Sequence, residues 1–218
     1  MLRSHNVNAL DHELQDVTAE TVRMLSMVRA SIAMARSALV DADPAAAEAC
    51  VANDVAIDEM QNKLEHHILS VIARRQPAAK DLRFLGAAHR SLTDIERAGD
   101  YAVHVAKAGR DLASEPPLKK YTDMSRILDV EDAMIEGTIA ALAESDEEKA
   151  RQALAMDEEI DQLYEQIQRE LLTYMMEDPA SITKATKLLS VGRYLERLGD
   201  HVENVNEHIL FWLTARRD

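Results

Sequence analysis

The sequence predicts an all-α protein of two tandem three-helix bundles, with six long helices in a pseudo-twofold repeat. Three observations predict this fold. Aromatic residues make up only 4% of the 218 residues, and glycine and proline number just 6 and 5. This composition argues strongly against a mainly β protein, because strands favour aromatic and β-branched residues and turns favour glycine. Apolar residues also recur at helical spacing, and the second half of the chain repeats motifs of the first.

Helical periodicity divides the chain into six expected helices. In the first of them, Leu10, Leu14 and Val17 begin an apolar stripe that continues at spacings of three and four to Leu39, which is the pattern of a bundle seam. Long helices with short connections pack as antiparallel neighbours. The expected helices cover residues 4–41, 45–75, 78–113, 119–144, 147–177 and 180–215.

Proline and capping residues mark where these helices begin. Pro44, Pro77 and Pro179 stand at the start of the second, third and sixth expected helices, because the first turn of a helix accepts proline. Asp146 is in position to cap the fifth. These breaks account for the short connections that a bundle needs.

The two halves are expected to be separate repeats that arose by duplication. Asp54 and Asp58 correspond to Asp157 and Asp161, 103 residues further on. The strongest break, Glu115-Pro116-Pro117, lies near the middle of the chain. We therefore expect a first repeat at residues 1–115 and a second at residues 116–218.

Charge and cysteine content exclude several classes of protein. The formal net charge is −14, which opposes nucleic-acid binding, since that needs a basic face. The single cysteine, Cys50, excludes an intrachain disulfide and argues against a thiolate zinc site. The N-terminus lacks the apolar region of a signal peptide, and no apolar run is long enough to span a membrane. A cytoplasmic protein is the simplest expectation.

Carboxylates recur in pairs near the expected seams. The pairs have i,i+4 spacing, which stacks the two side chains on one helical face. Carboxylates near a seam are costly unless they are paired, protonated or bound to a cation. Oxygen ligands favour magnesium, manganese, calcium or iron. The pairs are Asp54 and Asp58, Glu96 and Asp100, Asp157 and Asp161, and Glu196 and Asp200.

Neighbouring residues offer a different interpretation. Arg97 and Arg197 stand beside the pairs and would neutralise them as ordinary ion pairs. His104 follows Asp100 by one helical turn and is either an extra ligand or a polar residue at the bundle edge, whereas His201 is expected at the surface. The sequence contains no P-loop, GxGxxG, HExxH or Glu-x-x-His pattern. These motifs therefore provide no support for an enzymatic function.

The segment Leu195-Glu196-Arg197-Leu198-Gly199-Asp200-His201-Val202-Glu203-Asn204 resembles the PhoU family, and Ile95–Ala102 is its first-half copy. PhoU proteins are accessory regulators of bacterial phosphate transport and phosphate signalling. The resemblance covers essentially the whole chain. It implies two three-helix bundles packed as one six-helix protein.

The resemblance also implies multinuclear metal clusters of iron or zinc, held by the paired carboxylates. By position, one cluster would use Asp54, Asp58, Glu96 and Asp100, and the other Asp157, Asp161, Glu196 and Asp200. The halves differ, because Tyr101 stands where the second half has His201, and His104 stands where it has Asn204. Metal number or identity is therefore expected to differ between the two clusters.

Membership of that family would make the chain a negative regulator of phosphate uptake and of phosphate-starvation genes. The implied partners are the ATPase subunit of the phosphate ABC transporter and the phosphate sensor histidine kinase, at the cytoplasmic face of the membrane. A homodimer is compatible with the sequence, although no seam for it can be isolated. Two alternatives stay open: a metal-dependent enzyme, and a structural bundle without metal.

Overall fold

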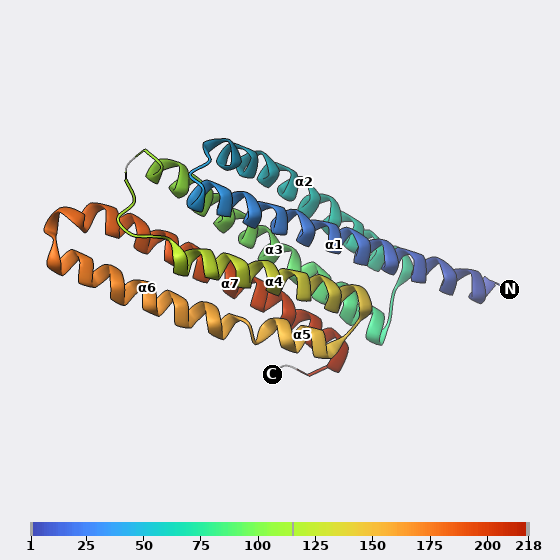
Figure 1. Ribbon diagram of the computed structural model, residues 1–218. Helices are drawn as coiled ribbons and strands as arrows, with labels where there is room; N and C mark the ends of the chain where they lie inside the picture. The colour runs from blue at the N-terminus through green and yellow to red at the C-terminus, as the bar shows by residue number, and fades with distance from the viewer. Residues whose placement is uncertain (1, 115, 217–218) are drawn as a thin grey trace.

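The computed structural model describes residues 2–114 and 116–216, and these ranges are helical almost throughout and contain no strand (Figure 1). All six expected segments are helical, so the predicted fold class is confirmed. The expected break at Glu115 to Pro117 includes Glu115, which lies outside the described residues. The helices are α1 (Leu2–Val40), α2 (Pro44–Arg75), α3 (Ala79–Leu112), α4 (Thr122–Glu144), α5 (Glu147–Leu154), α6 (Asp157–Glu177), the short 3₁₀ helix η1 (Pro179–Ser181) and α7 (Ile182–Thr214).

The same aspartate cap starts the second helix of each half. The Asp43 carboxylate accepts hydrogen bonds from the backbone N–H groups of Ala45 and Ala46, at 2.9 and 3.3 Å. The Asp146 carboxylate accepts equivalent bonds from Glu148 and Lys149, at 2.9 and 3.2 Å. Each cap satisfies donors that have no partner inside the helix. Asp43 and Asp146, which are equivalent positions of the repeat, therefore both act as helix N-caps.

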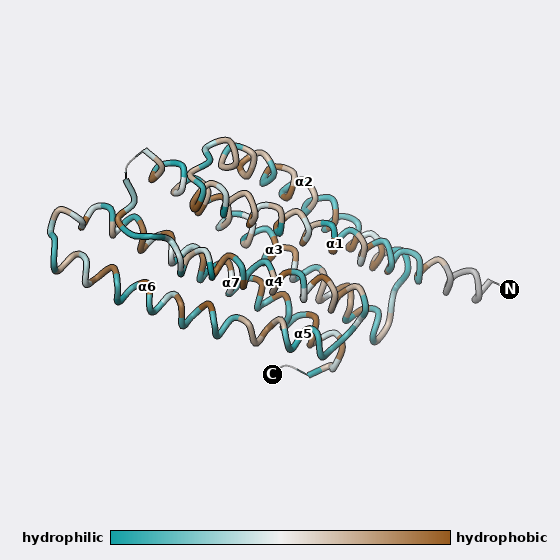
Figure 2. Tube along the Cα trace, in the orientation of Figure 1, coloured by the Kyte–Doolittle hydropathy of each residue, from teal (hydrophilic) through white to brown (hydrophobic). Residues whose placement is uncertain are grey.

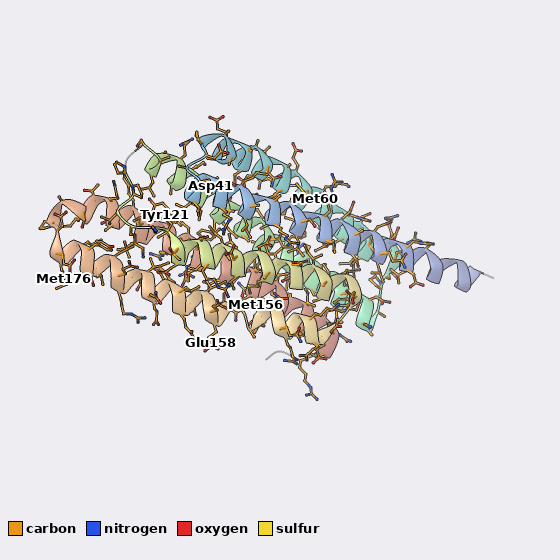
Figure 3. The ribbon with its side chains drawn as sticks, in the orientation of Figure 1. Asp41, Met60, Tyr121, Met156, Glu158 and Met176 are labelled. Carbon is orange, nitrogen blue, oxygen red and sulfur yellow. The ribbon has the colours of Figure 1, made fainter. Side chains whose placement is uncertain are left out.

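The fifth expected helix is divided in two, which the periodicity did not predict. The chain turns tightly at Ala155 and Met156, where the Met156 N–H bonds to the Ala153 carbonyl at 3.1 Å, an i−3 bond. Met156 is labelled at this junction in Figure 3. Its counterpart in the unbroken α2 is Asn53, whose amide donates to the Ser31 hydroxyl on α1 at 2.8 Å. Met156 has no side-chain donor and therefore cannot form an equivalent hydrogen bond.

The two three-helix units pack against each other through α3 and α7, whose mutual contact is the most extensive between any two helices, and through α1 and α4. The helices α2 and α6 lie on opposite outer edges (Figure 1). Each unit consists of one copy of the repeat, α1 to α3 or α4 to α7. This arrangement matches the expected pseudo-twofold relation.

The core follows the apolar stripes that the sequence contains. Val17, Met24 and Val28 on α1 are completely buried, and apolar and polar residues alternate along every helix (Figure 2). Between the units, the rings of Phe84 on α3 and Trp212 on α7 have centroids 4.8 Å apart. One continuous core therefore spans both halves. Among the described residues, no helix is both long enough and apolar enough to cross a membrane.

Candidate metal centres

Three carboxylates meet in the second half, where the start of α6 faces α7. Asp157 is the first residue of α6, and only 7% of its surface is exposed. Asp200 and Glu203 lie one turn apart on α7 and are partly buried. One oxygen from each of the three side chains lies within 4.8 Å of the other two. In the described part of the chain, this is the one group of three such atoms close enough to hold a single cation.

The absence of a side chain at Gly199 allows Asp157 into this position. A Cβ atom at residue 199 would lie only 2.7 Å from Oδ1 of Asp157. That distance is too short for a contact between a carbon and an oxygen atom, so any residue other than glycine would force Asp157 to move. Gly199 therefore permits a close approach between α6 and α7. Oδ1 of Asp157 and Oε2 of Glu196 are buried and have no hydrogen-bond partner in the described structure. Such oxygen atoms attract a proton or a cation.

The environment raises the pKa of several of these carboxyl groups. Burial, followed by repulsion from Glu203 and Asp161, raises the pKa of Asp157 to about 7. Burial and the charge of Asp200 also raise the pKa values of Asp161 and Glu196. Several negative charges are therefore held close together without enough compensation, which is the electrostatic condition that favours a bound cation.

The first half contains a looser version of the same arrangement. Oδ1 of Asp54 is buried without a hydrogen-bond partner and lies 3.7 Å from the position of a Cβ at Gly99. Burial and then Asp100 raise the pKa values of both Asp54 and Glu96. Asp58 is exposed, as is its counterpart Asp161. The four residues expected in each half are electrostatic neighbours. Of these eight residues, only Asp157 and Asp200 belong to a group of three close ligand atoms in the described structure, and the role of all eight as ligands stays a prediction.

Arginine pairs with several of these carboxylates, and Nε of Arg197 lies 3.5 Å from Oε2 of Glu196. Nη1 of Arg97 lies 3.3 Å from Oδ2 of Asp100, and Nη1 of Arg197 lies 3.0 Å from Oδ2 of Asp200. The side chains of both arginines are about half exposed, at 56% and 45%. These ion pairs leave the buried Oδ1 atom of Asp157 without a hydrogen-bond partner among the described residues.

Comparison with known proteins identifies the family to which this arrangement belongs. The model of the PhoU domain matches residues 21–109 and again residues 124–209. The chain belongs to the PhoU family. A PhoU homolog of Deinococcus radiodurans, named a phosphate-specific transport system accessory protein, is 43% identical over 210 residues, which are 96% of this chain and 99% of that protein. A homolog of the same name from Xylella fastidiosa is 35% identical over 98% of this chain and 90% of its own.

Solved PhoU structures have the same fold. PhoU from Pseudomonas aeruginosa aligns with a TM-score of 0.90 and 32% identity, covering 94% of this chain and 99% of its own. The phosphate transport system regulatory protein PhoU from Streptococcus pneumoniae aligns with a TM-score of 0.88 and 26% identity, covering 96% and 99% of the two chains. The arrangement of helices described above is therefore that of the PhoU family.

The PhoU repeat is asymmetric where α3 meets α7. The ring of Tyr101 stacks on that of His201, with centroids 5.7 Å apart, and the ring of His104 lies 5.1 Å from that of Tyr194. His104 is exposed at this seam and points toward no carboxylate group close enough to form a cation site with it. It is therefore a residue of the bundle edge in the described structure.

Asp94, the counterpart of Tyr194, binds side chains of the opposite unit. Its Oδ1 accepts from Nδ1 of His201 at 3.0 Å and from the amide of Asn204 at 3.2 Å, and its Oδ2 bonds to Nε2 of His208 at 3.3 Å. Burial alone would raise the pKa of Asp94, but the hydrogen bonds from the two histidines outweigh it and hold the pKa well below its usual range. The expectation that His201 lies at the surface is wrong, because it is partly buried in this network.

Sequence reasoning missed two carboxylates of the second PhoU repeat. Glu203 lies one turn after Asp200, but its first-half counterpart is Val103, so matching the repeats concealed it. Glu131 lies in α4 within an apolar stripe that includes Ile127. A glutamate at such a position is itself a signal, since buried charges are rare without a partner. Neither residue belongs to a motif shared by the two halves.

Proposed function

We propose that this protein is an accessory regulator of phosphate transport and a negative regulator of phosphate-starvation genes. The observation that carries the proposal is membership of the PhoU family, with 43% identity over 96% of the chain to a phosphate-specific transport system accessory protein. Family membership supports a regulatory role, and a non-enzymatic adaptor is what we propose. The long helices, which share one continuous core, provide a rigid surface for partners.

The proposed partners are two components of the phosphate-sensing machinery. One is the ATPase subunit of the phosphate ABC transporter, and the other is the phosphate sensor histidine kinase. The chain would act in the cytoplasm, peripheral to the membrane, where it lets the transporter hold the kinase in its inhibitory state when phosphate is abundant. A homodimer is part of the same proposal. The net charge of −14 favours basic contact surfaces on these partners.

We further propose that each carboxylate cluster binds metal, and that the clusters are multinuclear. Their donors are oxygen atoms alone, so the site favours iron, manganese or magnesium over zinc, which prefers nitrogen and sulfur ligands. A bound cation would supply positive charge between neighbouring helices. The helices would position the carboxylates around the cation: α6 contributes Asp157, and α7 contributes Glu196 and Asp200. The equivalent first site would use Asp54, Asp58, Glu96 and Asp100 of α2 and α3.

Gene expression tests the regulatory role. Deleting the gene for this chain should raise expression of a phosphate-starvation reporter in phosphate-rich medium, because the signal from the transporter to the kinase is lost. A plasmid copy of the wild-type gene should restore repression. Reporter activity that stays low in the deletion strain would contradict the proposal. A strain that lacks the kinase serves as the control, since deletion of the regulator should have no effect there.

Elemental analysis distinguishes metal clusters from a purely structural bundle. Protein purified without chelator or affinity metal should contain more than one metal ion per chain. The content should fall in a variant with Asp157→Asn, Asp161→Asn, Glu196→Gln and Asp200→Asn, because these changes keep shape but remove charge. A metal-free wild-type protein would show instead that the carboxylates serve as partners of Arg97 and Arg197 or as docking contacts.

A further inference from the structure

A pocket of about 550 Å³ lies where α3, α5 and the C-terminal part of α7 meet. We call it the arginine pocket. Its volume is in the range of sites that hold small organic ligands, and none of the paired carboxylates lines it. Its lining includes three arginines from different segments and three apolar side chains, namely Arg90, Arg151 and Arg216, and Leu154, Leu210 and Phe211.

The arginine pocket concentrates positive charge on a chain whose net charge is −14. Arg90 and Arg216 are exposed, and neither pairs with a carboxylate of the described residues. Arg151 forms an ion pair at 2.9 Å with Glu147, one turn earlier on α5, and both side chains are about half exposed. The exposed Glu207 supplies the one carboxylate in the described lining. Positive charge is therefore in excess, and an anion would compensate it.

A three-helix unit does not require this group of residues, because the first repeat lacks it. The first unit forms the same long helices and the same aspartate cap. The short helix α5 contacts α7 and brings its arginine to the C-terminal end of that helix (Figure 1). The arginines therefore contribute something other than the stability of the bundle. The first-half counterparts of Arg151 and Phe211 are Glu48 and Asp111, and the second-half counterpart of Arg90 is Ser190.

We propose that the arginine pocket binds a phosphorylated metabolite of nucleotide size. Guanidinium groups form paired hydrogen bonds with phosphate oxygen atoms. A phosphoryl group carries about two negative charges at neutral pH, more than one carboxylate provides. The ring of Phe211 and the side chain of Leu154 would pack against a planar base, since an aromatic ring can stack on any base. This site is separate from the carboxylate clusters and goes beyond the proposed regulatory role.

His208 connects the arginine pocket to the seam between the two repeats. It lines the pocket, and its Nε2 bonds to Oδ2 of Asp94 on α3 at 3.3 Å. Arg90 and Asp94 lie one turn apart on the same helix. A ligand held by Arg90 and Arg151 would therefore contact both three-helix units and strengthen their association. Because such a ligand binds the folded state alone, it should raise the melting temperature of the whole chain.

Calorimetric titration with ADP and GDP tests the arginine pocket. Each nucleotide is titrated into full-length protein without added divalent cations, and adenosine and inorganic phosphate are titrated separately. We expect one nucleotide per chain, a melting temperature that rises with nucleotide concentration, no binding of adenosine, and weaker binding of inorganic phosphate than of ADP. Arg90→Gln and Arg151→Gln should each weaken ADP binding by about tenfold or more, because each removes a charged hydrogen-bond donor to phosphate.

Arg169→Gln is the matched control. Arg169 on α6 is exposed and pairs with Glu165 one turn earlier, as Arg151 does with Glu147. It does not line the arginine pocket, so its replacement should leave ADP binding unchanged. The variant without the four carboxylates of the second cluster should also bind ADP as the wild type does.

Four results would overturn the inference. They are absence of binding by both nucleotides, wild-type affinity in both Arg90→Gln and Arg151→Gln, inorganic phosphate that binds as tightly as ADP, and loss of ADP binding in the four-carboxylate variant, which would assign the nucleotide to the metal clusters. None of these results decides the reporter experiment, so the regulatory role is tested independently.

Discussion

The carboxyl group of Asp157 has a more confined environment than its counterpart in the first half. A Cβ atom at Gly199 would come within 2.7 Å of its Oδ1, whereas the equivalent distance from Gly99 to Oδ1 of Asp54 is 3.7 Å. The additional burial and the nearby Glu203 raise the pKa of Asp157 to about 7. The environment of Asp157 therefore makes the second cluster the stronger candidate for binding a cation.

The raised pKa of Asp157 makes the stability of the metal-free protein depend on pH. The folded state holds this proton more tightly than the unfolded chain does, so the contribution to stability is full below about pH 4 and is lost as the pH rises through about 7. We expect the melting temperature of metal-free protein to fall by several degrees between pH 5 and pH 8. Asp157→Asn should show a smaller fall, measured by differential scanning calorimetry.

The exposed Asp58 provides the control for this measurement. Asp58→Asn removes a carboxylate of the first cluster that lies in solvent, so it should keep the pH dependence of the wild type. An equally steep fall in Asp157→Asn would contradict the assignment. Added Mn²⁺ should oppose the fall, because metal binding requires deprotonated carboxylates and strengthens as the pH rises.

Close contact between α1 and α3 restricts which residues can occupy position 109. On α3, a Cβ atom at Gly109 would lie 2.7 Å from both Cα and N of Leu39, which are backbone atoms of α1. Backbone atoms of a packed helix cannot move aside as a flexible side chain would. By contrast, no atom lies within 4 Å of a Cβ at Gly86, which is on the same helix. The close contact with α1 therefore requires glycine at position 109, whereas position 86 has space for a side chain.

Alanine substitution at these two glycines should have opposite effects on stability. Gly109→Ala should destabilise the protein by about 1–3 kcal/mol, because it forces α1 and α3 apart. Gly86→Ala should stabilise it by about 0.5–1 kcal/mol, since alanine has the better helix propensity and space is available. Urea denaturation followed by circular dichroism measures both values. Equal shifts in the same direction would show that α1 and α3 do not approach as closely as described.

The α3–α7 seam makes one folded body from two repeats. Asp94 on α3 bonds to three side chains of α7, and Phe84 packs against Trp212. The core is continuous across this seam. Repeat units with a shared core depend on their neighbours for stability. We therefore expect the proposed division into residues 1–115 and 116–218 to describe the repeat rather than two independently stable domains.

The two halves are expected to fold poorly when separated. Full-length protein should unfold in a single calorimetric transition. A fragment of residues 1–115 should expose the apolar part of α3 that normally meets α7, and should therefore self-associate or melt at a much lower temperature. Size-exclusion chromatography and calorimetry of the fragment, alone and mixed with residues 116–218, measure this. A monomeric fragment as stable as the full chain would contradict the dependence.

Local patterns in the sequence were sufficient for the helices and for the paired carboxylates. Helical periodicity and the caps at Asp43 and Asp146 depend on residues a few positions apart, so they are readable without the fold. Comparison of the two halves identified Asp54 and Asp157, because an aspartate occupies the equivalent position in each repeat. The fold class and the proximity of the paired carboxylates in each half followed from those local patterns, while the role of these carboxylates as ligands stays a prediction.

Contacts between helices were decided by the tertiary structure alone. The partners of Asp94, the complete burial of Glu131, and the turn at Met156 depend on how each helix is rotated and shifted against its neighbours. Small changes in rotation decide which side chain faces a seam, and no spacing within a single helix encodes that choice. The sequence therefore determined the fold class and the spacing of the paired carboxylates, whereas packing decided where the fifth expected helix divides and which residues of other helices lie near the carboxylates.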